Sequence, residues 1–114
     1  MSRARVRVCS LTELELGVPR LVRVGGEDVC LVRCEDGVHA VSDLCTHEDV
    51  SLAEGDVDLE SCEIECWKHG SVFSLRTGEA LCLPATRPVA VYEVRVEGDD
   101  VEVVLGARDA EASR

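Results

Sequence analysis

The sequence predicts an all-β fold built from antiparallel sheets. Short runs rich in Val and Leu recur along the chain, and Gly- and Asp-containing turn signals separate them. Aromatic residues make up only 3% of the chain. The core must therefore consist mostly of Val and Leu, which in short runs favour strands. A chain of 114 residues has the length of one modest domain, and we expect a single domain over residues 1–114.

Six runs have the composition of strands, and the turns between them predict how they pair. GGED, EDG and GDD each separate two neighbouring runs and are signals for antiparallel hairpins. A short helical turn is expected over residues 10–16, because Ser10 is a favourable N-cap and Glu13 follows three positions later. The predicted strands are 4–9, 19–24, 29–34, 38–42, 90–97 and 101–105.

The middle third of the chain, residues 43–89, lacks such runs and is predicted to be irregular and rich in loops. A stretch of about 45 residues without strong structure of its own is unusual in a compact domain unless something organises it. A metal centre would do so. We therefore expect a β framework formed by residues 4–42 and 88–105, a loop-rich metal-binding subdomain at about 43–84, and a polar tail over 107–114.

The charge of the chain limits its partners. The formal net charge is −11, from 23 acidic and 12 basic residues. Nucleic acids and anionic membranes are disfavoured, because phosphate binding needs clustered Lys and Arg. An acidic surface suits docking on basic patches of other proteins, or serves solubility alone.

The sequence also predicts where the protein is located. No apolar run approaches the ~18 residues of a membrane span, and no signal-peptide pattern is present, so we expect a cytoplasmic protein.

Two Cys–His pairs lie in the loop-rich segment. Seven cysteines in a chain of this length point to metal or redox chemistry before disulfides. Cys45 and His47 belong to the sequence CTH, and Cys66 and His69 belong to CWKHG. Two thiols and two imidazoles suit a structural zinc ion. In extended backbone, however, residues i and i+2 lie roughly 6–7 Å apart, and ligands at that separation reach two neighbouring metal ions more readily than one.

These motifs resemble those of the Rieske-type [2Fe–2S] ferredoxins, which share a C-x-H…C-x-x-H pattern. The resemblance continues through SVFSLRTGEA and LPATRPVAVYEVRVEGDDV and covers most of the chain. It implies a Rieske-type iron–sulfur fold with one [2Fe–2S] cluster per chain. Cys45 and Cys66 would bind one iron as thiolates, and His47 and His69 would bind the other as neutral imidazoles. No catalytic residue is implied.

The resemblance also implies a reduction potential. High-potential relatives carry a disulfide beside the cluster, but the corresponding positions here are Val50 and Lys68. Ser71 matches a Ser that hydrogen-bonds the cluster in those relatives, whereas Phe73 stands where they have a Tyr donor. We therefore expect a potential in the lower half of the Rieske range of about −150 to +300 mV.

The implied function is that of a soluble one-electron carrier and not of an enzyme. Rieske ferredoxins of multicomponent non-haem iron oxygenases pass electrons from a flavin-dependent NAD(P)H reductase to a terminal oxygenase. The first alternative is an accessory ferredoxin in iron–sulfur cluster assembly, since close relatives with similar C-W-x-H-G and L-P-A-T-R-P stretches accompany that machinery. A nitrite reductase small subunit is a weaker alternative, because those tend to lose the ligands. A zinc-stabilised binding module without a redox role also stays open.

The remaining cysteines have no role in the resemblance: Cys9, Cys30, Cys34, Cys62 and Cys82. We expect them to be small buried hydrophobes, with incidental reactivity left open for Cys62. Cys30 and Cys34 would lie roughly 13 Å apart along a strand, too far to share one metal ion. His39 is predicted to be a surface or packing residue, not a ligand. Trp67 is expected either to shield the cluster from water or to pack in the core.

Overall fold

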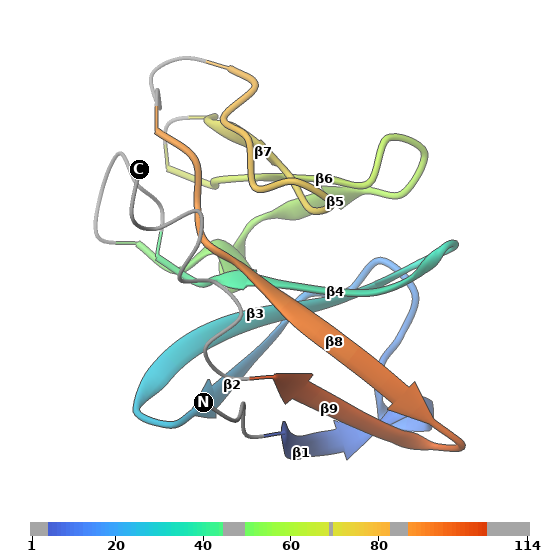
Figure 1. The fold of residues 1–114 in the computed structure, drawn as a ribbon. Helices are drawn as coiled ribbons and strands as arrows, with labels where there is room; N and C mark the ends of the chain where they lie inside the picture. The colour runs from blue at the N-terminus through green and yellow to red at the C-terminus, as the bar shows by residue number, and fades with distance from the viewer. Residues whose placement is uncertain (1–4, 45–49, 69, 83–86, 105–114) are drawn as a thin grey trace.

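The computed structural model of this chain describes residues 5–44, 50–68, 70–82 and 87–104. Within them, six strands form a larger antiparallel sheet in the order β1-β9-β8-β4-β3-β2, and three form a smaller sheet in the order β5-β6-β7 (Figure 1). The strands are β1 (Arg5–Ser10), β2 (Arg20–Val24), β3 (Glu27–Cys34), β4 (Gly37–Ser42), β5 (Asp56–Asp58), β6 (Glu63–Glu65), β7 (Val72–Ser74), β8 (Val91–Glu97) and β9 (Asp100–Val104).

The larger sheet confirms the predicted all-β class. Each of the six predicted strands lies on one of its strands, and β2–β3, β3–β4 and β8–β9 pair as antiparallel neighbours. The expected helical turn is a short 3-10 helix, η1 (Leu11–Glu13), which is shorter than the predicted range. Its N-cap is Ser10, whose backbone N–H donates to the Glu13 carboxylate at 3.4 Å.

Strand β3 contributes to two cores, because successive side chains of a strand point to opposite faces. Val29 and Leu31 enter the framework core, which lies among the strands of the larger sheet. Cys30, Val32 and Cys34 enter the inter-sheet core, which lies between the larger and smaller sheets. With both faces covered, this strand reads as a continuous apolar run rather than an alternating one.

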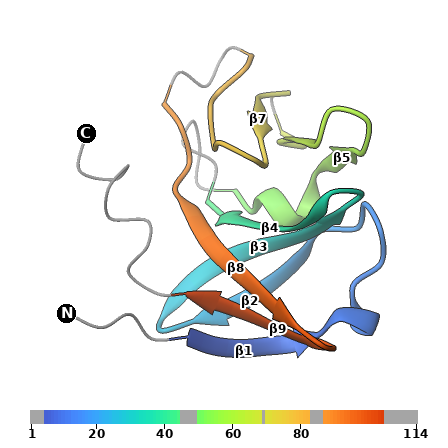
Figure 2. The same cartoon turned by 45° about the vertical axis from the view of Figure 1, so that its right-hand side comes forward.

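The middle third has more regular structure than the sequence predicts. It contains a second 3-10 helix, η2 (Leu52–Glu54), and the three strands of the smaller sheet, which lies over β3 and β4 (Figures 1 and 2). Each of those strands is three residues long, too short for alternation to show in the sequence. The central residue Ile64 pairs with Val57 on one side and Phe73 on the other.

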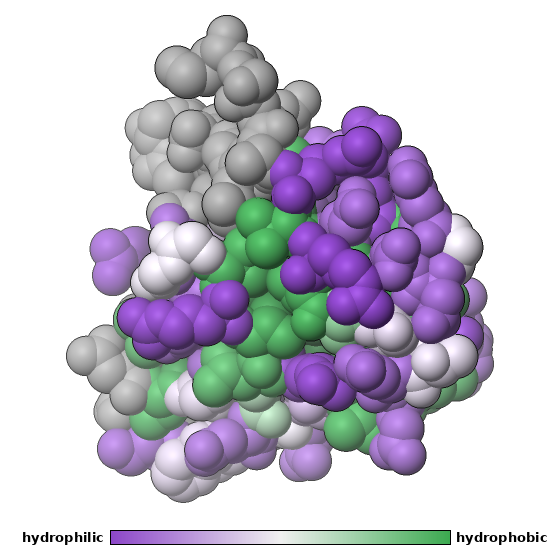
Figure 3. Space-filling model, turned by 90° about the horizontal axis from the view of Figure 1, so that it is seen from below, coloured by the Kyte–Doolittle hydropathy of each residue, from purple (hydrophilic) through white to green (hydrophobic). Residues whose placement is uncertain are grey.

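The side of the molecule opposite the smaller sheet shows apolar surface gathered in the middle, with hydrophilic residues around it (Figure 3). Among the described residues, no helix is long and apolar enough to cross a membrane. The polar tail predicted over 107–114 lies outside the described residues, and the predicted subdomain boundaries remain predictions.

Candidate metal centre

The second Cys–His pair belongs to the turn between β6 and β7. Cys66 follows β6 directly, and its side chain is buried at 2% exposure. Its backbone N–H donates to the Ser71 carbonyl at 2.7 Å, and the Gly70 N–H donates to the Cys66 carbonyl at 3.0 Å. Gly70 has a φ of 77°, a left-handed conformation that glycine adopts without strain. The turn therefore holds the Cys66 thiol in a defined, buried position. His69 lies outside the described residues.

The first Cys–His pair, Cys45 and His47, also lies outside the described residues, but both ends of its segment are described. Leu44 and Ser51 form an isolated antiparallel bridge on either side of it. The Leu52 N–H donates to the carbonyl of Asp43, the residue directly after β4, at 2.6 Å. These contacts bring the described residues on the two sides of the segment next to each other.

Asp43 strengthens this contact with its side chain. It is 4% exposed, and its carboxylate accepts a hydrogen bond of 2.8 Å from the Ala53 N–H. Burial raises the pKa of Asp43, whereas hydrogen bonds from Ser51 and Ala53 act in the opposite direction. Reasoning from the sequence missed this residue. A buried acid can be found only once the fold shows which polar side chain the chain encloses.

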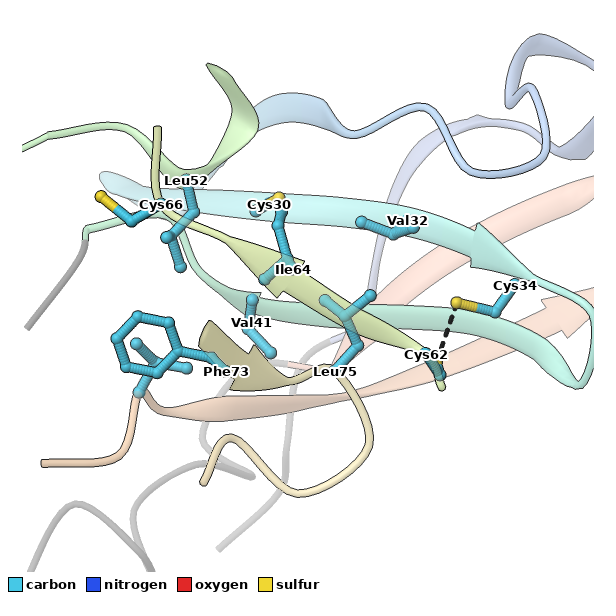
Figure 4. Close-up of a cluster of buried hydrophobic side chains, with 11 residues drawn as sticks. Cys30, Val32, Cys34, Val41, Leu52, Cys62, Ile64, Cys66, Phe73 and Leu75 are labelled. Carbon is cyan, nitrogen blue, oxygen red and sulfur yellow. Dashed lines mark hydrogen bonds between the residues drawn. The ribbon is translucent and has the colours of Figure 1, made fainter. Parts of the chain in front are cut away.

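One described residue after the first Cys–His pair and one from the second pair lie in the same core. Leu52, after the first pair, and Cys66, in the second, both belong to the inter-sheet core and lie at the same end of it (Figure 4). A Rieske cluster takes two thiolates and two imidazoles. A buried thiol at a hairpin turn fits that donor set, and so do the further Cys and His in the sequence between the paired residues Leu44 and Ser51. The complete ligand set Cys45, His47, Cys66 and His69 remains a prediction.

Three large apolar side chains that are close in sequence to the Cys–His pairs or to residues 83–86 are exposed. Leu44 is 52% exposed, Trp67 53% and Leu81 44%, and each stands within two residues of one of the segments 45–49, 69 and 83–86. We call these three residues the apolar rim. The exposure of Trp67 rules out a role in core packing. Ser71 and Phe73, by contrast, are fully buried.

Four of the five other cysteines are buried, as predicted: Cys9, Cys30, Cys34 and Cys62. The prediction is wrong for Cys82, which is exposed, because it follows the smaller sheet and faces neither core. The Sγ atoms of Cys34 and Cys62 lie 2.8 Å apart, a contact that the sequence did not suggest. These two residues are 28 positions apart and belong to different layers of the fold.

His39 is half-buried and takes part in a polar network near this cysteine pair. Its Nε2 lies 2.9 Å from one carboxylate oxygen of Asp36, and the Arg76 Nε donates to the other oxygen at 2.9 Å. Hydrogen bonds from His39 and Arg76 lower the pKa of Asp36 to about 2. The carboxylate therefore stays ionised at neutral pH. The sequence predicted a surface or packing role for His39 and missed this network.

The chain belongs to the Rieske [2Fe-2S] domain family, whose model matches residues 4–93. The 3-phenylpropionate/cinnamic acid dioxygenase ferredoxin subunit of Escherichia coli (strain K12) is 40% identical over 85 residues, which are 75% of this chain and 70% of that protein. The ferredoxin of carbazole 1,9a-dioxygenase from Nocardioides aromaticivorans IC177 is 42% identical with a TM-score of 0.85, and the match covers 88% of this chain and 96% of that one.

A third match comes from a complex of reduced oxygenase and oxidized ferredoxin in carbazole 1,9a-dioxygenase. It is 36% identical with a TM-score of 0.81, and it covers 90% of this chain and 94% of that one. The family match and these relatives confirm the predicted Rieske-type fold, the [2Fe–2S] cofactor and the class of protein. The protein is a Rieske electron carrier.

Proposed function

We propose that this protein passes single electrons from a flavin-dependent NAD(P)H reductase to a terminal non-haem iron oxygenase. The observation that carries the proposal is the buried Cys66 thiol, held at a hairpin turn next to the exposed Trp67. Two relatives support the choice of acceptor: one is the ferredoxin subunit of a dioxygenase, and another was solved together with its oxygenase. Because the donor would draw on NAD(P)H, we also propose a cytoplasmic location.

The proposed cluster ligands divide into two chemical pairs. Cys45 and Cys66 would supply thiolates to one iron, and His47 and His69 would supply neutral imidazoles to the other. When bound, the cluster accepts and releases one electron. The buried position of Cys66 keeps its sulfur away from water, and the turn to Ser71 restricts how far the ligand can move. This restriction would limit how far the Cys66 ligand moves when the charge of the cluster changes by one electron.

The apolar rim is the surface that we propose to meet the partners. Interfaces combine an apolar centre with a polar border, and Leu44, Trp67 and Leu81 expose apolar side chains beside the proposed ligands. The net charge of −11 would favour partners with basic patches and would speed their encounter. A small apolar centre within an acidic surface suits the weak, short-lived complexes of electron transfer.

The first experiment combines metal analysis with electron paramagnetic resonance of the dithionite-reduced protein. We expect about two irons per chain, a red-brown colour, and a rhombic signal whose average g value lies below that of all-cysteine clusters. Cys66→Ser should lose the iron, and Cys82→Ser, which removes an exposed cysteine, should keep it. A colourless protein with one zinc and no signal would overturn the electron-carrier function.

The choice of partner needs a second measurement. The photoreduced protein is mixed with a purified Rieske oxygenase or with a cysteine desulfurase and its scaffold, and cluster reoxidation is followed in the visible spectrum. Rapid reoxidation by the oxygenase alone is the expected result. Reoxidation that requires the desulfurase and scaffold would instead support the role in iron–sulfur cluster assembly.

A further inference from the structure

Four potential metal ligands come together at a place that the electron-carrier function does not use. The ligand atoms of Cys34, Asp36, His39 and Cys62 all lie within 4.8 Å of one another. The inter-sheet core separates them from the proposed cluster site, because Cys66 lies at one end of this core and the Cys34–Cys62 pair at the other (Figure 4).

Three of these residues come from one hairpin. Cys34 is the last residue of β3, and Asp36 lies in the turn. His39 is on β4 and pairs with Val32 of β3. An antiparallel hairpin with a two-residue turn brings the ends of its strands together. Cys34 and His39 therefore lie on neighbouring strands beside the turn. This arrangement follows from the register of β3 and β4 and needs no contact with the rest of the molecule.

The fourth residue, Cys62, lies in the turn directly before β6 of the smaller sheet. It has a φ of 58°, a left-handed conformation that is uncommon for residues other than Gly, Asn and Asp. Its carbonyl accepts a hydrogen bond of 2.9 Å from the Leu75 N–H, which holds the turn in place. The result is an Sγ–Sγ distance of 2.8 Å to Cys34. Strained residues of this kind persist where the surroundings fix them, and they are often found at functional sites.

We propose that Cys34, Asp36, His39 and Cys62 form a second metal site, which binds one zinc ion. Two sulfurs, one imidazole nitrogen and one carboxylate oxygen make a donor set that zinc accepts in tetrahedral geometry. With Zn–S bonds of about 2.3 Å, two thiolates on one zinc lie about 3.8 Å apart. The two sulfurs must therefore separate by about 1 Å, which rotations of their side chains can provide. Binding releases one proton from each thiol to solvent.

The surrounding residues suit such an ion. The Arg76 Nε holds one oxygen of Asp36 at 2.9 Å, and the other oxygen faces the His39 Nε2. Carboxylate ligands of metal sites are usually oriented by a hydrogen bond of this kind. The side chains of His39 and Asp36 are 21% and 43% exposed, so an ion can enter from their side, whereas both thiols face the core.

The proposed zinc would be structural and independent of the iron–sulfur cluster. All four ligands come from the protein, so no coordination position stays open for a substrate. Cys62 precedes β6 and Cys66 follows it, and the two residues lie at opposite ends of the inter-sheet core (Figure 4). One ion would join the β3–β4 hairpin of the larger sheet to the smaller sheet, at the end of the inter-sheet core away from Cys66.

The test measures zinc and iron on the same sample. The holoprotein, with its iron intact, is incubated with one equivalent of zinc sulfate, desalted, and examined by inductively coupled plasma mass spectrometry. We expect about one zinc per chain in addition to the iron, and X-ray absorption at the zinc edge should show two sulfur ligands at about 2.3 Å. His39→Asn should keep the iron and lose the zinc. Cys30→Ala, which removes a buried cysteine outside the group, should keep both metals.

Three results would overturn the proposal. The wild-type protein could retain no zinc while keeping its iron. The His39→Asn variant could retain as much zinc as the wild type, which would indicate an adventitious ion only. Peptide mapping without reductant could find Cys34 and Cys62 joined by a disulfide, formed by loss of two protons and two electrons to an oxidant. Since iron is counted separately, failure here is distinguishable from failure of the electron-carrier function.

Discussion

The Asp43 carboxylate and the Ala53 N–H are joined by a hydrogen bond of 2.8 Å across the base of the segment that contains Cys45 and His47. Asp43→Ala removes the acceptor and leaves a partly buried N–H unpaired, so we expect a loss of about 1–3 kcal/mol in the free energy of unfolding. The iron content after purification should fall with it. Denaturant titration and iron analysis measure both effects.

Asp43→Asn is the matched control. The amide oxygen can still accept the Ala53 hydrogen bond, and a neutral side chain suits this position because burial raises the pKa of Asp43. A raised pKa means that the fold favours the protonated form. The stability that this group contributes at low pH is lost as pH rises through its folded pKa. We expect Asn to cost less stability than Ala at neutral pH, because it keeps an acceptor for the Ala53 N–H. Equal losses in both variants would contradict the role of the hydrogen bond.

Gly55 allows the backbone before β5 to approach β6. A Cβ at this position would lie 1.9 Å from the carbonyl oxygen of Glu65, so Gly55→Ala must push the two segments apart. We expect a loss of about 3 kcal/mol or more in the free energy of unfolding. Gly26→Ala is the control, because its Cβ would meet nothing within 4 Å and only its φ of 83° is unfavourable. That change should cost about 1–2 kcal/mol. A similar cost for both would show that the close approach is unimportant.

Trp67 is the largest side chain of the apolar rim. If the rim docks on the oxygenase, Trp67→Ala should lower kcat/KM for electron transfer by about tenfold, because Trp is among the residues that contribute most to interfaces. The electron paramagnetic resonance signal should not change. Leu21→Ala removes an equally exposed side chain, at 51%, from an edge strand of the larger sheet. This variant should transfer electrons at the wild-type rate, and a defect of the same size would argue against docking at the rim.

The net charge of −11 predicts that electron transfer depends on salt. Attraction between an acidic carrier and basic partners is screened over about 10 Å at 0.1 M salt. Raising sodium chloride from about 0.05 to about 0.5 M should therefore slow the second-order rate of electron transfer by about tenfold or more. Stopped-flow mixing measures this rate directly. A rate that does not change with salt would show that charge serves solubility alone.

Cys82 should differ in reactivity from the other cysteines, because it is exposed. Burial raises the pKa of the Cys30 thiol, and reagents react with the thiolate. In the native holoprotein at pH 8, a maleimide should therefore modify Cys82 within minutes and leave Cys30 unmodified. Mass spectrometry of peptides identifies the modified residue, with Cys82→Ser as the control. Rapid modification of Cys30 would mean that the framework opens far more readily than its packing suggests.

Much of the fold could be predicted because local sequence patterns indicate the strands and hairpins of the larger sheet. The alternation in β1, the turn glycines of the hairpins and the capping pattern of Ser10 with Glu13 each depend on residues close together in the sequence. The pairing of β1 with β9 could not be predicted in this way. It joins Arg5 to Val104, and no local pattern specifies which distant strand completes a sheet edge.

The sequence by itself predicted the class of fold, because strand periodicity is a local property of the chain, and its resemblance to the Rieske-type ferredoxins implied the cofactor and the candidate ligands. Tertiary structure alone decided which polar groups are buried and which cysteines meet. Asp43 is buried and binds the Ala53 N–H of the short helix η2, and Cys34 contacts Cys62 of the neighbouring layer. Such contacts arise when separate sheets pack face to face, so they depend on the whole fold and not on neighbours in the sequence.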